Sequence, residues 1–337
     1  MLDTVSGAEA PPFALQLKAL LEQEFRCQPK LCGLRVLESA HDNGVRMTVK
    51  MRDFEVKDLL SLTRFFGFSA ETFSLAVSLL DRFLSLMKIP KVVFICTLNN
   101  ARTDFSSTPP LSIWSKFHLY QDVYVKIQPK HLSCVGLCCF YIAVKTSEEE
   151  KNVPLASDLI RISQNRFTVS DMIRMEKIVL EKLYWKVKAP TALHFLRLFH
   201  SQIQEKVDAD SKKILNIERL EAQLKACHCS FAFTKLRPSL VALALLAREV
   251  EEQHESESVE ALRDAVKDLL HQLTIKDGDL VCVRELVSKC LIEYSATKCW
   301  KPNSQRLRWI ISGRTARQLK HSYYKITHLP TIPESTS

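Results

Sequence analysis

Four charged residues, Arg52, Asp81, Lys145 and Glu176, stand on faces of predicted helices that are otherwise apolar. Each lies three, four or seven residues from large apolar side chains, which is the spacing of one helical face. Because a buried charge is costly unless it is paired, these residues suggest two ion pairs, Arg52 with Asp81 and Lys145 with Glu176. The alternative is that the side chains run along the edge of an apolar face with their charged ends in water. No nucleophile accompanies them, so the chain is not expected to be an enzyme.

The composition also argues against the common enzyme classes. The 337 residues include only 7 glycines, and the phosphate-binding patterns GxGxxG and GxxxxGK[ST] are absent, as are HExxH and GxSxG. Lys and Arg number 47 against 38 Asp and Glu, but this net charge of +9 is spread along the chain. The hydrophobic content of 46% suffices for ordinary cores, and the length is typical of about two domains. We expect an all-helical binding protein that uses neither cofactor nor metal.

Neither a secretory signal nor a membrane-spanning segment is visible. The longest apolar run, 134–144, is far shorter than the roughly 20 residues that a bilayer requires. We therefore expect the protein in the nucleus and cytoplasm, where its 11 cysteines stay reduced. The triplet Cys227-His228-Cys229 suggests a metal site, but adjacent helical residues point apart and no second ligand pair follows at zinc-finger spacing. The basic cluster between Arg314 and Lys325 is more simply a solvated helix face than a nucleic-acid site.

Helical periodicity runs through most of the chain, and no convincing alternating β-strand interrupts it. Thr168 followed by Asp171 resembles a capping box, and Pro129, Pro190 and Pro238 stand where a first helical turn would begin. We predict helices at 13–26, 51–66, 70–87, 129–146, 154–163, 169–183, 190–204, 213–233, 238–254, 258–273, 279–295 and 303–321.

The stretch 90–127 does not fit this pattern. It separates two strong helices by 38 residues, where a helical bundle normally uses about 2–8. A regulatory insertion carrying the Thr108-Pro109 step, a splice variant and translated non-coding sequence all explain it. The low acidic content and the short helix connection left after excision favour the last two explanations.

The segments around the four charges resemble the cyclins. In the order and spacing of the cyclin box they are Met51-Arg52, LAVSLLDRFL (75–84), Ala143-Val-Lys145 with Glu148-Glu149, and RMEKIVL (174–180). The resemblance is stronger to the G-type cyclins, and among them to the first subtype. It is carried by CGLRVLESAHDNG (32–44), RDFEVKDLLSL (52–62), LEAQLKACHC (220–229) and GRTARQLKHSYY (313–324).

The resemblance implies an all-α fold of two stacked five-helix cyclin boxes with an N-terminal helix. It divides the chain into an N-terminal segment (1–48), a first box (49–188) interrupted by 90–127, a second cyclin-like fold (189–300) and a basic C-terminal helix and tail (301–337). In such a fold the Arg52–Asp81 pair locks the first helix of the box against the second. Lys145 and Glu176 occupy the positions that hydrogen-bond the backbone of a bound kinase, and Ile142, Leu180, Trp185 and Val187 match the apolar contacts around them.

The resemblance also implies the partners. A cyclin-dependent serine/threonine kinase is expected, so that the chain controls cell-cycle progression or growth arrest. The alternative is a non-activating adaptor, linked to growth arrest and the DNA damage response, that recruits a protein phosphatase 2A regulatory subunit or a cyclin-G-associated kinase. The peptide-docking positions read Met51, Phe54, Glu55 and Asp58, where cell-cycle cyclins have an apolar set, so apolar substrate motifs should bind weakly. Neither a membrane nor a nucleic acid is an expected partner.

Overall fold

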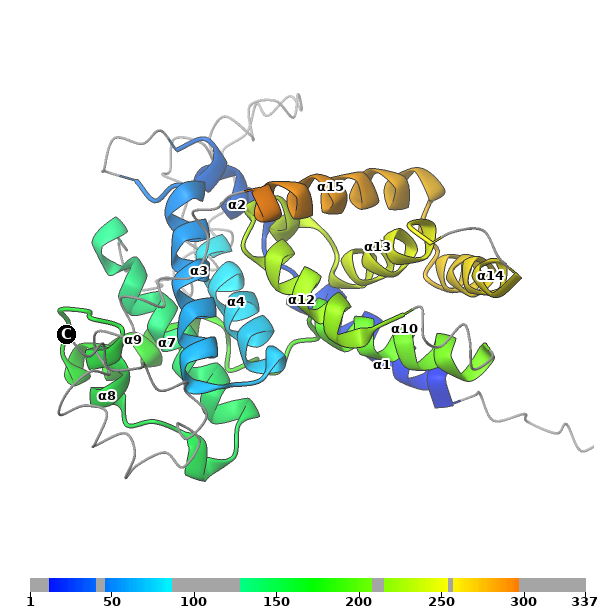
Figure 1. Ribbon diagram of the computed structural model, residues 1–337. Helices are drawn as coiled ribbons and strands as arrows, with labels where there is room; N and C mark the ends of the chain where they lie inside the picture. The colour runs from blue at the N-terminus through cyan, green and yellow to red at the C-terminus, as the bar shows by residue number, and fades with distance from the viewer. Residues whose placement is uncertain (1–11, 41–45, 87–127, 208–214, 254–256, 297–337) are drawn as a thin grey trace, which may run out of the picture.

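The computed structural model describes residues 12–40, 46–86, 128–207, 215–253 and 257–296. Within these ranges all regular structure is helical, and the helices form two groups side by side (Figure 1). The predicted all-α fold is therefore confirmed. The 90–127 stretch and the predicted helix at 303–321 lie outside the described residues.

The first group, here the first box, is built around α7 (Leu132–Ser147). This helix has buried side chains on nearly all of its faces, as expected of a helix at the centre of a core. Helices α4, α9 and α3 pack directly against it. The other helices of this box are α3 (Val49–Phe66), α4 (Ala70–Ser85), α8 (Ala156–Ile162) and α9 (Val169–Lys182).

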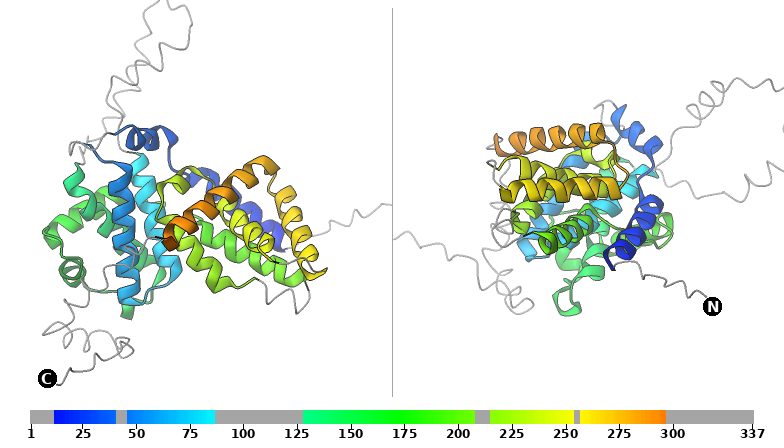
Figure 2. Two further views of the ribbon diagram at one scale, coloured as in Figure 1. Left: turned by 45° about the horizontal axis from the view of Figure 1, so that its top comes forward. Right: turned by 90° about the vertical axis from the view of Figure 1, so that its right-hand side faces the viewer.

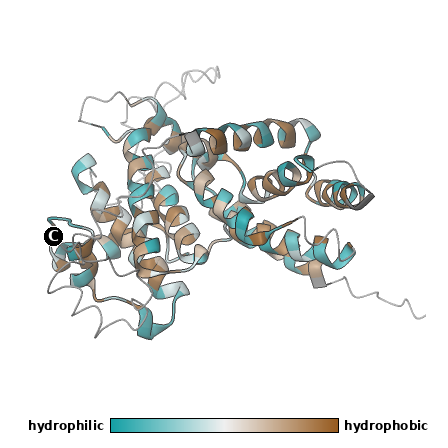
Figure 3. Ribbon diagram, in the orientation of Figure 1, coloured by the Kyte–Doolittle hydropathy of each residue, from teal (hydrophilic) through white to brown (hydrophobic). Residues whose placement is uncertain are grey.

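The second group, here the second box, repeats this plan around α13 (Pro238–Glu251). Nearly every residue of α13 from Ser239 to Val250 is buried, and α10, α15 and α14 pack against it. The other elements are α10 (Ala192–Lys206), α12 (Ile217–His228), the 3₁₀ turn η3 (Phe231–Lys235), α14 (Glu257–Gln272) and α15 (Asp277–Ala296). Each box has its own core of buried apolar side chains, and hydrophobic stretches, brown in Figure 3, occur along the helices of both boxes.

Two N-terminal helices, α1 (Pro12–Cys27) and α2 (Leu31–Glu38), join the boxes. Leu17 of α1 belongs to the core of the second box, whereas Leu34 of α2 belongs to the core of the first. Gly33 lets α2 approach α4 closely, because a Cβ at this position would lie 1.9 Å from the carbonyl oxygen of Ser85. Figure 2 shows α1 running along the second box and α2 against the first.

A buried carboxylate fixes α1 to the second box. Glu24 accepts hydrogen bonds from the backbone N–H (2.7 Å) and the hydroxyl (3.0 Å) of Ser239, in the first turn of α13. The free N–H groups of a helix start need such acceptors, so α1 caps α13. Burial raises the pKa of Glu24, although both hydrogen bonds from Ser239 oppose the shift.

Local side-chain chemistry sets the helix ends of the first box. Thr48 and Ser69 cap α3 and α4, and the predicted capping box of α9 forms between Thr168 and Asp171. Gly67 ends α3 with φ of 69°, a left-handed conformation that suits glycine.

Three elements differ from the periodicity-based prediction. The pattern does not reveal α2, because eight residues are too few to establish a helical period. The segment predicted as one helix to residue 233 breaks at His228 and continues as η3. The helix predicted from Pro129 opens with a 3₁₀ turn, and α7 proper begins at Leu132.

Candidate functional site

Arg52 and Asp81 form a fully buried ion pair between α3 and α4. The Arg52 Nε lies 2.8 Å from Asp81 Oδ1, and Nη2 lies 2.6 Å from Oδ2, so the guanidinium grips the carboxylate with two parallel bonds. The Arg52 side chain is only 1% exposed. Burial, the largest single influence, would lower the pKa of Arg52, but the charges of Asp81 and Asp53 and their hydrogen bonds together outweigh it and raise the pKa.

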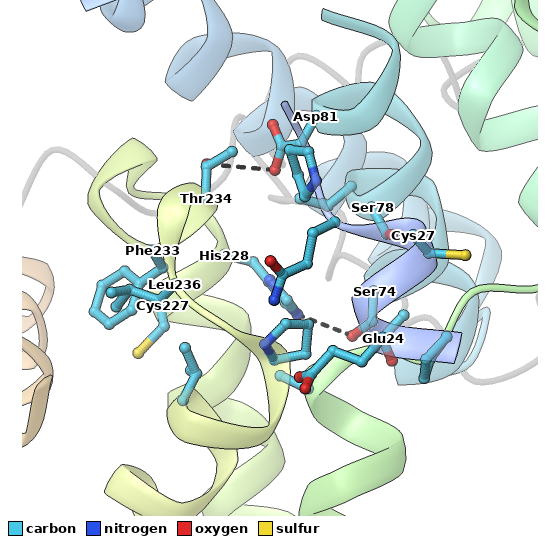
Figure 4. A pocket seen from close by; sticks show the side chains of 18 of the residues that line it. Glu24, Cys27, Ser74, Ser78, Asp81, Cys227, His228, Phe233, Thr234 and Leu236 are labelled. Carbon is cyan, nitrogen blue, oxygen red and sulfur yellow. Dashed lines mark hydrogen bonds between the residues drawn. The ribbon is translucent and has the colours of Figure 1, made fainter. Parts of the chain in front are cut away.

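The same pair reaches the second box. Arg52 Nη1 donates to the backbone carbonyl of His228 at the end of α12 (2.8 Å), and Asp81 Oδ2 accepts from the hydroxyl of Thr234 (3.4 Å). A small cavity of about 80 Å³ lies at this junction, with Ser74 and His228 joined across it at 3.1 Å (Figure 4). The pair therefore connects the two boxes as well as α3 and α4. Sequence spacing gives no signal of this, since Arg52 and His228 are 176 residues apart.

His228 is a structural residue of this junction. Burial and the adjacent Arg52 charge lower its pKa to about 3, so it is neutral at physiological pH. Its neighbours Cys227 and Cys229 are buried in the cores of different boxes, Cys227 in the second and Cys229 in the first. Across the described residues, no group of three or more His, Cys, Asp or Glu side chains is placed to hold a metal ion.

Lys145 and Glu176 form the other predicted pair, between α7 and α9. The Lys145 ammonium donates to Glu176 Oε1, and it also lies 4.5 Å from the centre of the Tyr141 ring. The Lys145 side chain is 40% exposed and that of Glu176 is 16% exposed. Unlike Arg52 and Asp81, this pair stands at the surface, where another protein can reach it.

Glu148 holds the end of α7 that carries Lys145. Its Oε1 accepts from the backbone N–H of Ser69 (2.9 Å), from the Ser69 hydroxyl (3.0 Å) and from the Thr72 hydroxyl. These donors belong to the first turn of α4, so a carboxylate after α7 caps the start of α4. The position of Lys145 is thereby tied to two helices.

The four apolar residues assigned to this surface lie at different depths. Trp185 is 68% exposed, and Leu180 and Val187 are half-buried. Ile142 is 3% exposed and belongs to the core of the first box, so it lies beneath the surface instead of on it. The analysis of spacing missed Tyr184, which is 67% exposed beside Trp185 and is not part of a regular helical pattern.

The two carboxylates at the expected peptide-docking positions have different surroundings. Phe54 and Asp58 are exposed, but Glu55 is buried with its carboxyl against Gly136 of α7, where a Cβ would lie 2.0 Å from Oε1. Burial and the nearby Asp58 charge raise the pKa of Glu55 to about 8. Of the two expected surface carboxylates, only Asp58 faces solvent.

Comparison with known proteins identifies the family. The model of the cyclin N-terminal domain matches residues 17–98 and 113–188. The chain is 56% identical over 335 residues to cyclin-G1 of Bos taurus, covering 99% of both chains. The chain belongs to the cyclin family, among the G-type cyclins. It is also 42% identical over 330 residues to cyclin-G2 of Mus musculus, covering 98% of this chain and 83% of the relative.

A solved structure supports the fold. A viral cyclin from herpesvirus saimiri superposes with a TM-score of 0.52 at 19% identity, covering 81% of this chain and 97% of that one. This similarity concerns the architecture of two stacked boxes. The family makes the chain a cyclin-type regulatory subunit. No described helix is long and apolar enough to cross a membrane.

Proposed function

We propose that the chain binds a cyclin-dependent serine/threonine protein kinase through the surface around Lys145 and Glu176, and thereby controls cell-cycle progression or growth arrest. One observation carries the proposal: a half-exposed ion pair connects the central helix of the first box to α9, and the turn that follows α9 carries an exposed tryptophan. Aromatic residues and charge pairs that lose their water on binding are typical of the residues that dominate protein interfaces.

The geometry leaves binding capacity on both partners of the pair. Only one Glu176 oxygen accepts from Lys145, and the Lys145 ammonium has three donors. Lys145 can therefore donate to a backbone carbonyl of a partner, and Glu176 can accept from a backbone N–H. In protein kinases, activity depends on the position of a mobile helix that supplies the glutamate of a Lys–Glu pair. A cyclin that binds only the active position of this helix shifts the kinase population toward the active state.

Co-purification with a panel of purified cyclin-dependent kinases tests the proposal. Replacing Lys145 and Glu176 by Ala should lower kinase affinity about 30-fold or more, because both charges would be desolvated in the complex. The matched control replaces Lys267 and Asp264 by Ala, which removes an ion pair of 2.9 Å on α14 in the second box. Kinase capture that survives the first change as well as the second refutes this binding mode.

The second candidate is a non-activating adaptor that recruits a protein phosphatase 2A regulatory subunit or a cyclin-G-associated kinase. The exposed Asp58 favours it, because a carboxylate at a peptide-docking position is poorly suited to capture apolar substrate motifs for a kinase. Phosphorylation of a generic substrate by the purified complex separates the two functions. A kinase that is bound and not activated supports the adaptor.

A further inference from the structure

Two cysteines from different helices meet in the second box. Cys227 lies on α12 and Cys290 lies on α15, and these two helices pack against each other. The Cys290 Sγ lies 3.9 Å from the carbonyl oxygen of Ala226, the residue before Cys227, and the two thiols hydrogen-bond each other. The fold therefore brings together two sulfurs that are 63 residues apart in the sequence (290 − 227 = 63).

The two sulfurs differ in their access to solvent. Cys227 is 0% exposed and belongs to the core of the second box. Cys290 packs against the same core but is only half-buried. A small solute can thus reach Cys290, while Cys227 is reached only through it. By contrast Cys134 and Cys138, which also hydrogen-bond each other, stand one turn apart on α7 and are both buried.

The hydrogen bond divides the roles between the thiols. It is the main reason that the pKa of Cys290 is lowered, against the opposing effects of burial and of the Glu293 charge. The same bond, together with burial, raises the pKa of Cys227. Asp53 and Lys57 of α3 also act on Cys290, with opposite signs. Because the thiolate is the reactive form of cysteine, Cys290 is the nucleophile and Cys227 keeps its proton.

We propose that Cys290 and Cys227 form a peroxide-reactive site, at which Cys290 is oxidised and Cys227 converts the product to a disulfide between α12 and α15. The Cys290 thiolate attacks one oxygen of hydrogen peroxide, the O–O bond breaks, and hydroxide leaves and takes up a proton to become water. Cys227 then attacks the sulfur of the Cys290 sulfenic acid, the S–O bond breaks, and a second water leaves with the Cys227 proton. Two thiols are oxidised by two electrons, and one peroxide is reduced to two waters.

The disulfide would lie beside the junction of the two boxes. His228 follows Cys227 directly, and its carbonyl accepts the hydrogen bond from Arg52. A covalent bond from α15 to α12 restricts the unfolded chain, so the oxidised protein should be more stable than the reduced one. In a reducing compartment such a bond is transient, which suits a site that reports peroxide.

Peptide mapping of the full chain tests the proposal. The reduced protein is treated with hydrogen peroxide, its remaining thiols are blocked with N-ethylmaleimide before unfolding, and trypsin is added without reductant. Trypsin should leave Cys227 and Cys229 on peptide 226–235 and Cys290 on peptide 290–298. We expect these two peptides to be linked. The melting temperature should rise by about 5 °C or more, and dithiothreitol should reverse both changes.

Three variants assign the sulfurs. Cys229→Ser should keep the linked peptide, whereas Cys227→Ser should abolish it and leave a Cys290 sulfenic acid that dimedone labels. Cys290→Ser, at the half-buried position, should abolish the peroxide-induced rise in melting temperature, and Cys282→Ser, at an exposed position of the same helix, should not. A link through Cys229, the absence of any link, or a melting temperature that peroxide does not raise overturns the proposal.

Discussion

Asp81→Asn is the sharpest test of the junction between the boxes. The change keeps the shape of the side chain but replaces a carboxylate that Arg52 grips through two bonds, at 2.8 and 2.6 Å. Breaking a buried ion pair typically costs about 3–5 kcal/mol. Arg52 keeps Asp53 as a counter-charge at 3.1 Å and the His228 carbonyl at 2.8 Å, so we expect the lower end, about 3 kcal/mol.

Urea unfolding followed by circular dichroism measures this cost. With a denaturant dependence of about 3 kcal/mol/M, the midpoint should fall by about 1 M. Asp264→Asn, in an exposed ion pair on α14, is the control and should change stability by no more than about 0.5 kcal/mol. A loss below about 1 kcal/mol for Asp81→Asn would contradict the reasoning about burial.

Amide hydrogen exchange tests which helices Asp81→Asn destabilises. Because Arg52 donates to the His228 carbonyl and Asp81 accepts from Thr234, protection should fall in α12 and η3 of the second box as well as in α3 and α4. Loss of protection confined to the first box would show that the junction bonds do not couple the boxes.

Two further predictions concern carboxylates with different surroundings. Glu148→Ala removes the acceptor of three hydrogen bonds at the start of α4, so it should lower the free energy of unfolding, measured by thermal melting, by about 1–3 kcal/mol. The same change at the exposed Glu150 is the control and should have little effect. Glu55 has its folded-state pKa raised from 4.5 to about 8, so the folded state keeps a proton that the unfolded state releases, and stability should fall by about 5 kcal/mol as the pH rises through this window. Glu55→Gln should flatten this fall in urea midpoints measured from pH 5 to 8, and an unchanged slope would show that another group titrates.

The ion pairs could be predicted from sequence because the helical period shows which charged residues lie on an apolar face. Arg52, Asp81, Lys145 and Glu176 each occupy the buried side of a strong helix, and charge balance leaves few ways to pair them. Both pairs form in the structure. The helical period does not show how deeply a particular side chain is buried. For this reason Ile142 and Trp185 were both predicted to contact a partner, although Ile142 is buried and Trp185 is exposed.

Contacts between the boxes could not be predicted for a related reason. In the second box, Arg52 bonds the backbone carbonyl of His228, which has no side-chain signal in the sequence, and Asp81 bonds Thr234 in the short turn η3, which has no helical period. The burial of Glu55 depends on Gly136, which leaves room for a carboxyl group that most helix pairs would exclude. Tyr184 was missed because its exposure follows from a left-handed backbone after the helix ends, beyond the reach of periodic patterns.

The two ion pairs show how burial decides what a charge pair is for. The guanidinium of Arg52 is planar and has five donors, which bond Asp81, Asp53 and the His228 carbonyl. This pair therefore serves the stability of the fold and has no donor group available to a partner. Lys145 donates to one oxygen of Glu176, and its side chain is 40% exposed, so the ammonium keeps further donors for a partner. Stability alone gives little reason for a half-exposed pair, because such pairs typically contribute about 0–1 kcal/mol. Its contribution becomes large only when a partner covers it and removes the water, which is the step that the proposed kinase complex supplies.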